Sequence, residues 1–216
     1  ESRKGVISLS AGRWMKQLHR LALTGVKPAD LSPAAQLHVL ALVDYTGQIG
    51  NYPGLQRLAR LQELRVEHTG AVALRLPRFK KVHKLSLRIT GSHALSFGDT
   101  ILSDLLAPTA TFVELITPKA EARSMAQLKG LSRVKQLVVS GDLATALLSN
   151  LSSFPGLEFF AAVDATFSMV QVKQALKSKG PLPHFIYFAA VDGQSLFLTE
   201  PSAHRALLSQ VVAPQG

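Results

Sequence analysis

The stretch Leu61-Gln-Glu-Leu64-Arg-Val66 and the later stretch Val82-His-Lys-Leu85-Ser-Leu87 share the form apolar-x-x-Leu-x-Leu. Alternation of apolar and polar residues over so short a run is typical of a β-strand with one buried face. Six more segments have this form or a looser one, and they start at Leu18, Leu37, Ala110, Val134, Leu157 and Phe185. Successive starts lie 19 to 28 residues apart. Such a regular period predicts a solenoid of stacked units.

Helical patterns lie between several of the predicted strands. The two longest cover residues 142–151 and 168–177, and the second begins at a capping residue, Ser168, and stops before Gly180-Pro181. A strand followed by a helix, repeated along the chain, predicts an α/β solenoid with a curved parallel sheet on its concave face. Short helices and turns would then form the convex face.

We therefore expect one domain, residues 1–216, with about eight repeats and a C-terminal cap from about residue 195. A run at residues 6–9 is interpreted as a degenerate first repeat. The predicted strands lie near residues 20–24, 39–43, 63–67, 84–88, 112–116, 136–140, 159–163 and 186–191.

These segments resemble the strand half of the leucine-rich repeat, L-x-x-L-x-L-x-x-N/C-x-L, over most of the chain. Their irregular lengths are similar to the F-box-associated type, although no F-box-like helical segment is visible. The resemblance implies an array that recruits partners. One departure is that the ninth position, where the family has its Asn or Cys ladder, holds Val26, Tyr45 and Thr69 in the first three repeats. The eighth position holds Gly or Asp, which suit the turn at the end of a strand: Gly25, Asp44, Gly141, Asp164 and Asp192.

The concave face of the predicted sheet carries the third, fifth and seventh residues of each repeat. In the C-terminal half these residues are mostly apolar, and exposed apolar patches often mark interaction sites. Two alternatives stay open: a terminal segment covers the patch, or a register error exchanges the inner face for the outer one. The candidate partner-binding residues are Phe112, Ile116, Val138, Phe159, Val163, Tyr187 and Val191.

Charge gives a second candidate surface. The chain has 24 Lys and Arg against 14 Asp and Glu, a net charge of +10. On the predicted sheet Glu63 faces Lys84 and Glu67 faces Arg88, which predicts two surface ion pairs. A basic cluster around the fourth predicted strand attracts phosphate or acidic groups. Its members are Arg75, Arg78, Lys80, Lys81, Lys84 and Arg88.

The sequence contains no motif that indicates an enzyme, a cofactor site or a metal site. His19 and His38 share a position in adjacent repeats, but a structural zinc site needs about four ligands and the rest are missing. The chain has no cysteine, which favours a reducing intracellular compartment, the cytoplasm or an organelle after processing. No apolar run reaches the roughly 20 residues that span a bilayer.

Two functions therefore remain open from the sequence. The first is a non-enzymatic scaffold or adaptor that binds a protein partner on the concave sheet. The alternative is a basic structural subunit of a ribonucleoprotein or organellar assembly that contacts RNA phosphates. The sequence gives no oligomeric state.

Overall fold

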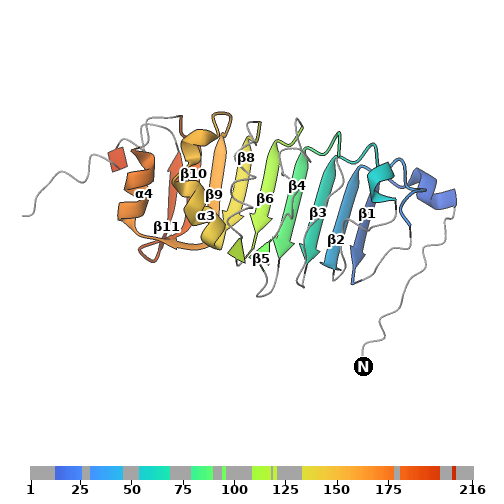
Figure 1. Ribbon diagram of the computed structural model, residues 1–216, viewed down its shortest axis with the longest axis horizontal. Helices are drawn as coiled ribbons and strands as arrows, with labels where there is room; N and C mark the ends of the chain where they lie inside the picture. Colours follow the sequence, from blue (N-terminus) through green and yellow to red (C-terminus); the bar gives the residue numbers. More distant parts are fainter. Residues whose placement is uncertain are drawn as a thin grey trace, which may run out of the picture.

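The computed structural model of the protein describes residues 13–25, 30–45, 54–68, 79–89, 94–95, 109–117, 119–120, 133–177, 181–199 and 206–207. Within these ranges nine strands form one sheet, in the order β1-β2-β3-β4-β6-β8-β9-β10-β11. Every neighbouring pair is parallel except β10 and β11, which are antiparallel. The strands lie side by side in sequence order (Figure 1). This topology confirms the predicted α/β, leucine-rich-repeat-like solenoid.

The strands of the large sheet are β1 (Arg20–Thr24), β2 (Val39–Tyr45), β3 (Glu63–His68), β4 (Lys84–Ile89), β6 (Phe112–Ile116), β8 (Gln136–Ser140), β9 (Phe159–Phe167), β10 (Phe185–Val191) and β11 (Gln194–Thr199). Two short strands, β5 (Ala94–Leu95) and β7 (Lys119–Ala120), pair separately. The helices are α3 (Gly141–Leu148), α4 (Met169–Leu176) and the 3₁₀ helices η1 (Arg13–Gln17), η3 (Leu55–Arg57) and η4 (Leu151–Ser153). The predicted first repeat at residues 6–9 lies outside the described residues.

A backbone ladder joins the repeats at the edge of the sheet where the strands begin. The carbonyl of His19 accepts hydrogen bonds from the amides of both His38 and Val39, at 2.8 and 3.1 Å. The same double acceptance recurs at the carbonyls of His38, Gln62, His83, Thr111 and Lys135. Each repeat is therefore fixed to the next before its strand starts, although the family's Asn or Cys ladder is missing.

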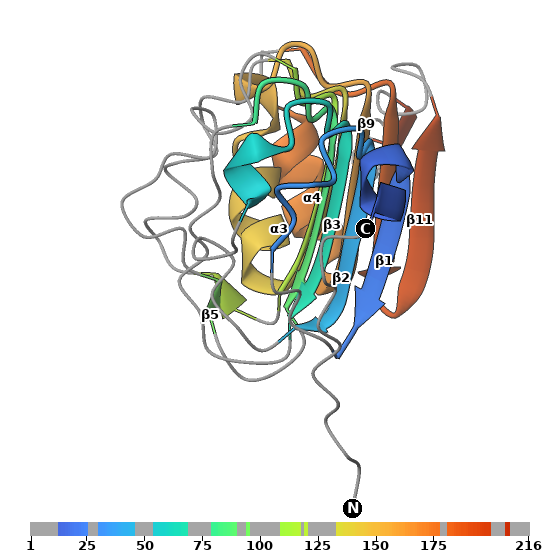
Figure 2. The same ribbon diagram turned by 90° about the vertical axis from the view of Figure 1, so that its right-hand side faces the viewer.

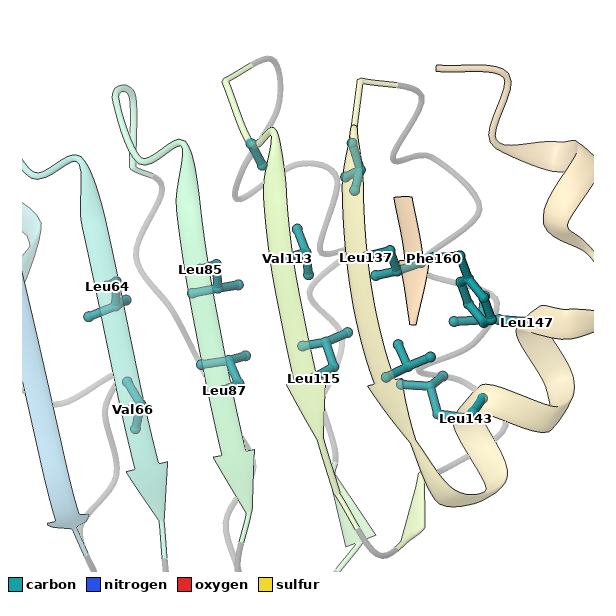
Figure 3. Close-up of a cluster of buried hydrophobic side chains, with 14 of the residues drawn as sticks. Leu64, Val66, Leu85, Leu87, Val113, Leu115, Leu137, Leu143, Leu147 and Phe160 are labelled. Carbon is teal, nitrogen blue, oxygen red and sulfur yellow. The ribbon is translucent and has the colours of Figure 1, made fainter. Parts of the chain in front are cut away.

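The core lies between the sheet and the helices and connectors. The strands contribute the fourth and sixth residues of the repeats to it, such as Leu64 and Val66 on β3 and Leu85 and Leu87 on β4, all nearly inaccessible to solvent. Figure 3 shows these side chains in successive rows, with Leu143 and Leu147 of α3 closing over Phe160. Burial of each such side chain contributes about 1.5–3 kcal/mol, so the aligned rows stabilise the stack.

Helix α4 follows the sequence prediction closely. The Ser168 hydroxyl accepts a hydrogen bond from the amide of Gln171, and the Gln171 side chain accepts one from the Ser168 amide, which completes a capping box. Helix α3 begins one residue earlier than predicted and ends at Leu148, and η4 follows it.

Four of the five eighth-position Gly and Asp residues have a positive φ angle. The φ angles of Gly25, Gly141, Asp164 and Asp192 are 64°, 53°, 49° and 47°. Asp164 differs from the prediction in one respect, because β9 continues beyond it to Phe167 instead of ending. Asp44 lies within β2, where the register with β3 shifts between Leu42 and Tyr45.

A hairpin forms the C-terminal end of the sheet, where the predicted cap begins. Asp192 and Gly193 both have positive φ, as a two-residue hairpin turn requires, and they join β10 to the antiparallel strand β11. A strand of the same sheet, β11, therefore forms the start of the predicted cap. Beyond residue 199, only residues 206–207 of the predicted cap are among the described residues.

We expect Gly54→Ala to destabilise the protein much more than Gly193→Ala. The two glycines have similar φ angles, 81° and 82°. A Cβ at residue 54 would lie 2.2 Å from the amide nitrogen of Ser32 and 2.5 Å from Asp30 Oδ1, whereas a Cβ at residue 193 would meet nothing within 4 Å. Gly193→Ala should thus cost only the left-handed backbone penalty, about 1–2 kcal/mol. Urea unfolding measures both losses, and equal losses would contradict the close packing of these connectors.

Candidate partner-binding face

The face of the sheet opposite α3 and α4 is the candidate binding surface, and we call it the open face. Figure 2 shows both helices on one side of the sheet and β11 displaced toward the other side, so the open face is the concave one. Third, fifth and seventh residues of the repeats lie on it, as the alternating burial along β6 shows: Phe112, Glu114 and Ile116 are partly exposed, whereas Val113 and Leu115 are buried.

Aromatic side chains gather on the C-terminal half of the open face. The rings of Phe185 and Phe197 stack with their centroids 6.5 Å apart, and Tyr187 meets Phe197 edge-on at 6.3 Å. Phe185 is 45% exposed and Phe197 54%. Phe159 lies beside Phe185 in the register of β9 and β10. We call these four residues together with Phe112 the aromatic patch, and a surface of this kind is typical of an interaction site.

Six of the seven predicted partner-binding residues lie on the open face. They are partly exposed, and they are Phe112, Ile116, Val138, Phe159, Val163 and Tyr187. The prediction is wrong for Val191, whose side chain is buried, with only 3% of its surface exposed. The cause is a register shift between Phe188 and Ala190, after which Ala190 and Val191 pair with Thr166 and Phe167 of β9.

Sequence reasoning misses Phe185 and Phe197, the two most exposed aromatics of the patch. The sequence pattern assigns Phe185 to the first position of its repeat, but this residue pairs with Phe159, a third-position residue. The repeat therefore starts two residues earlier, at Pro183. Phe197 lies on β11, and the turn signal that finds this strand is the Asp192-Gly193 dipeptide, which favours a tight hairpin.

The charged side chains of the open face pair with one another. Glu63 and Lys84 form the predicted ion pair, at 3.7 Å. The predicted pair between Glu67 and Arg88 is wrong: Arg88 binds Glu114 on the other neighbouring strand, at 2.7 Å. Glu67 lies 3.6 Å from Arg65 on its own strand instead. Three basic and three acidic side chains thus cancel on β3, β4 and β6, although the chain has a net charge of +10.

Glu114 accepts hydrogen bonds from a second side chain besides Arg88. The hydroxyl of Ser86, a buried residue, donates a hydrogen bond to Glu114 Oε2, while Arg88 Nη2 donates to Oε1. Burial raises the pKa of Glu114, but the hydrogen bonds from Arg88 and Ser86 outweigh it, so the pKa lies below its ordinary value of 4.5. Glu114 is therefore ionised at neutral pH, and hydrogen bonds from Ser86 and Arg88 fix its carboxylate in the middle of the open face.

The structure describes four of the six predicted phosphate-contacting residues, and these four lie in two places. Lys84 and Arg88 lie on the open face and are engaged by Glu63 and Glu114. Lys84 Nζ also lies 5.5 Å from the centre of the Phe112 ring. Lys80 and Lys81 are exposed and precede β4. Arg75 and Arg78 lie outside the described residues.

The two histidines considered as metal ligands stack on each other. The rings of His19 and His38 are 5.4 Å apart and nearly parallel, at 5°. Over the part of the chain that the structure describes, no group of three or more His, Cys, Asp or Glu side chains could hold a metal ion. No helix in those ranges is long and apolar enough to cross a membrane.

Neither a family model nor a curated protein matches the chain. Among solved structures, it is similar to an internalin from Listeria monocytogenes (strain 4b F2365), with a TM-score of 0.47 and 19% sequence identity. The match covers 92% of this chain and 54% of the internalin chain, so the protein spans about half the length of that internalin. The fold assignment rests on the order and direction of the strands in the sheet.

We expect Glu114→Gln to remove a pH-dependent part of the stability. A depressed pKa in the folded state contributes stability that is fully present above the ordinary pKa of 4.5 and is lost as pH falls through the lower folded value. The variant's deficit relative to wild type should therefore be largest near neutral pH and shrink below pH 4.5. Unfolding titrations at several pH values measure this difference.

Glu158→Gln is the matched control, because Glu158 pairs with Lys135 but both side chains are about half exposed. An exposed pair contributes roughly 0–1 kcal/mol. A deficit for Glu114→Gln that is no larger than that of the control at every pH would contradict the role assigned to the cluster of Ser86, Arg88 and Glu114.

Proposed function

We propose that this protein is a non-enzymatic binding scaffold, an adaptor that holds a protein partner on its open face. One observation carries the proposal: Phe185 and Phe197 stack on this face with about half of each side chain exposed. A monomer gains nothing from aromatic rings left in water, whereas an interface uses such rings as anchors. The neighbouring acidic and basic side chains on β3, β4 and β6 neutralise one another. They therefore contribute to the choice of partner without repelling an acidic or a basic one.

The chemistry of the open face favours a partner segment with two features. Apolar or aromatic side chains would cover the aromatic patch, and acidic groups would lie near the exposed Lys80 and Lys81, which precede the strand next to Phe112. A curved parallel sheet suits such a segment, because it offers an extended concave surface.

We also propose a repeat type and a cellular compartment for this adaptor. We assign its repeats to the irregular, F-box-associated type because the spacing between strands varies from 19 to 28 residues. We assign it to a reducing compartment inside the cell because the chain has no cysteine.

The alternative function, contact with RNA phosphates in a ribonucleoprotein or organellar assembly, has one observation in its favour. Lys80 and Lys81 are exposed, and the chain as a whole carries +10. Phosphate contacts weaken steeply as salt concentration rises, whereas an apolar interface does not. Salt therefore separates the two functions.

We expect Phe112→Asp/Phe159→Asp to abolish capture of the partner from lysate while the protein stays folded. Loss of two anchors should cost at least about 2 kcal/mol, or roughly thirtyfold in Kd. The control is Val170→Asp, because Val170 is 74% exposed but lies on α4, away from the open face. The measurement is capture at low and high salt, followed by mass spectrometry and RNA quantification.

A protein that survives high salt, is retained by Val170→Asp and is lost from the Phe112/Phe159 variant supports the adaptor. RNA that disappears at high salt and from Lys80→Glu/Lys81→Glu, but not from the Phe112/Phe159 variant, overturns it in favour of the alternative.

A further inference from the structure

Among the described residues, no strand lies beyond the outer edge of β11. β11 is the last strand in the sheet order, and in the described ranges only β10 pairs with it. Such an edge offers backbone amides and carbonyls to any other strand, and proteins usually guard it with charged residues or proline. The β11 sequence, Gln194-Ser-Leu-Phe-Leu-Thr199, contains neither. The strand at the opposite end, β1, carries Arg20.

Both faces of this edge are apolar. Leu196 and Leu198 lie opposite Phe188 and Ile186 of β10, on the side of the core, and Leu196 is only partly buried. Phe197 lies opposite Tyr187 on the open face. Two hydrophobic layers, one above and one below the sheet, therefore run out to the edge and stop there.

We propose that β11 pairs antiparallel with β11 of a second copy of this chain, around a two-fold axis that passes through the sheet at Phe197. Residues directly opposite in an antiparallel pair share a face. Phe197 would then face Phe197 of the second copy on the open face. On the core side Leu196 would face Leu198, and on the open face Ser195 would face Thr199. In this register each of these side chains of β11 faces one of the same chemical kind in the second copy: aromatic rings, leucines or hydroxyl groups.

Charge explains why a second copy fits this edge. Two chains of net charge +10 repel each other over most of their surfaces. The six residues of β11 carry no charge, so two copies that meet at this edge bring no like charges of β11 into contact. A two-fold interface must be self-complementary, and the pairing around Phe197 has this property. The sheet would continue through both copies with the two open faces on the same side.

The test is sedimentation velocity on the purified full chain over a range of concentrations. Wild type should form a dimer as concentration rises. Phe197→Lys and Phe197→Glu should each weaken self-association by roughly tenfold or more, because like charges then meet at the axis. An equimolar mixture of the two variants should recover the dimer, since opposite charges meet there. Val170→Lys is the control and should dimerise as wild type does.

Several results would overturn the pairing. A wild type that stays monomeric up to its solubility limit excludes it. Dimers of Phe197→Lys and Phe197→Glu as stable as the wild-type dimer would place the interface elsewhere, and a mixture that fails to recover the dimer would exclude an axis at Phe197. Far-ultraviolet circular dichroism confirms that each variant is folded. The inference needs only the β11 edge and does not rest on the proposed function, whose test uses residues of β6 and β9.

Discussion

The structure depends on one repeated interaction, the double hydrogen bond that the second-position carbonyls of six repeats accept from the next repeat. His19, His38, Gln62, His83, Thr111 and Lys135 all make it. It aligns the strands before they begin, so apolar residues at the fourth and sixth positions fall into rows regardless of connector length. The bond uses only backbone atoms, so residues as different as His, Gln, Thr and Lys can occupy this position.

Alignment also decides what the open face can do. Residues of the same position lie about 4.8 Å apart on neighbouring strands, so a few outward side chains become a continuous surface. On β3, β4 and β6 this proximity neutralises charge, and from β6 to β11 it gathers aromatic rings. The open face therefore has paired charges on β3, β4 and β6 and aromatic rings toward β11. Both features follow from the sequence of each strand and from the common register of the strands. The exposed Lys80 and Lys81 take no part in these ion pairs.

Much of this arrangement could be predicted because local pattern determines it. The ranges 20–24, 112–116 and 136–140 coincide with β1, β6 and β8. The pattern places Tyr187 on the correct face although it starts the repeat two residues late, because a shift of two residues preserves the face of a strand.

The sequence could not predict which of two nearby side chains a residue would bind, or where the register between strands would shift. In the register Arg88 lies opposite Glu67 on one side and Ile116 on the other, yet it binds Glu114, which lies opposite Ser86. The shift that buries Val191 arises from pairing with β9, which no local pattern encodes.

The central claim is that one face of the sheet is packed and the other is open, with Phe160 and Phe188 turned inward and Tyr187 turned outward. Hydroxyl-radical footprinting with residue-level mass spectrometry tests it most directly, because the reaction labels aromatic rings according to their exposure. The account predicts strong labelling of Phe185, Tyr187 and Phe197 and weak labelling of the buried Phe160, Phe167 and Phe188. Equal protection of all six rings would show that the open face is covered, and strong labelling of Phe188 with protection of Tyr187 would show that the register is wrong.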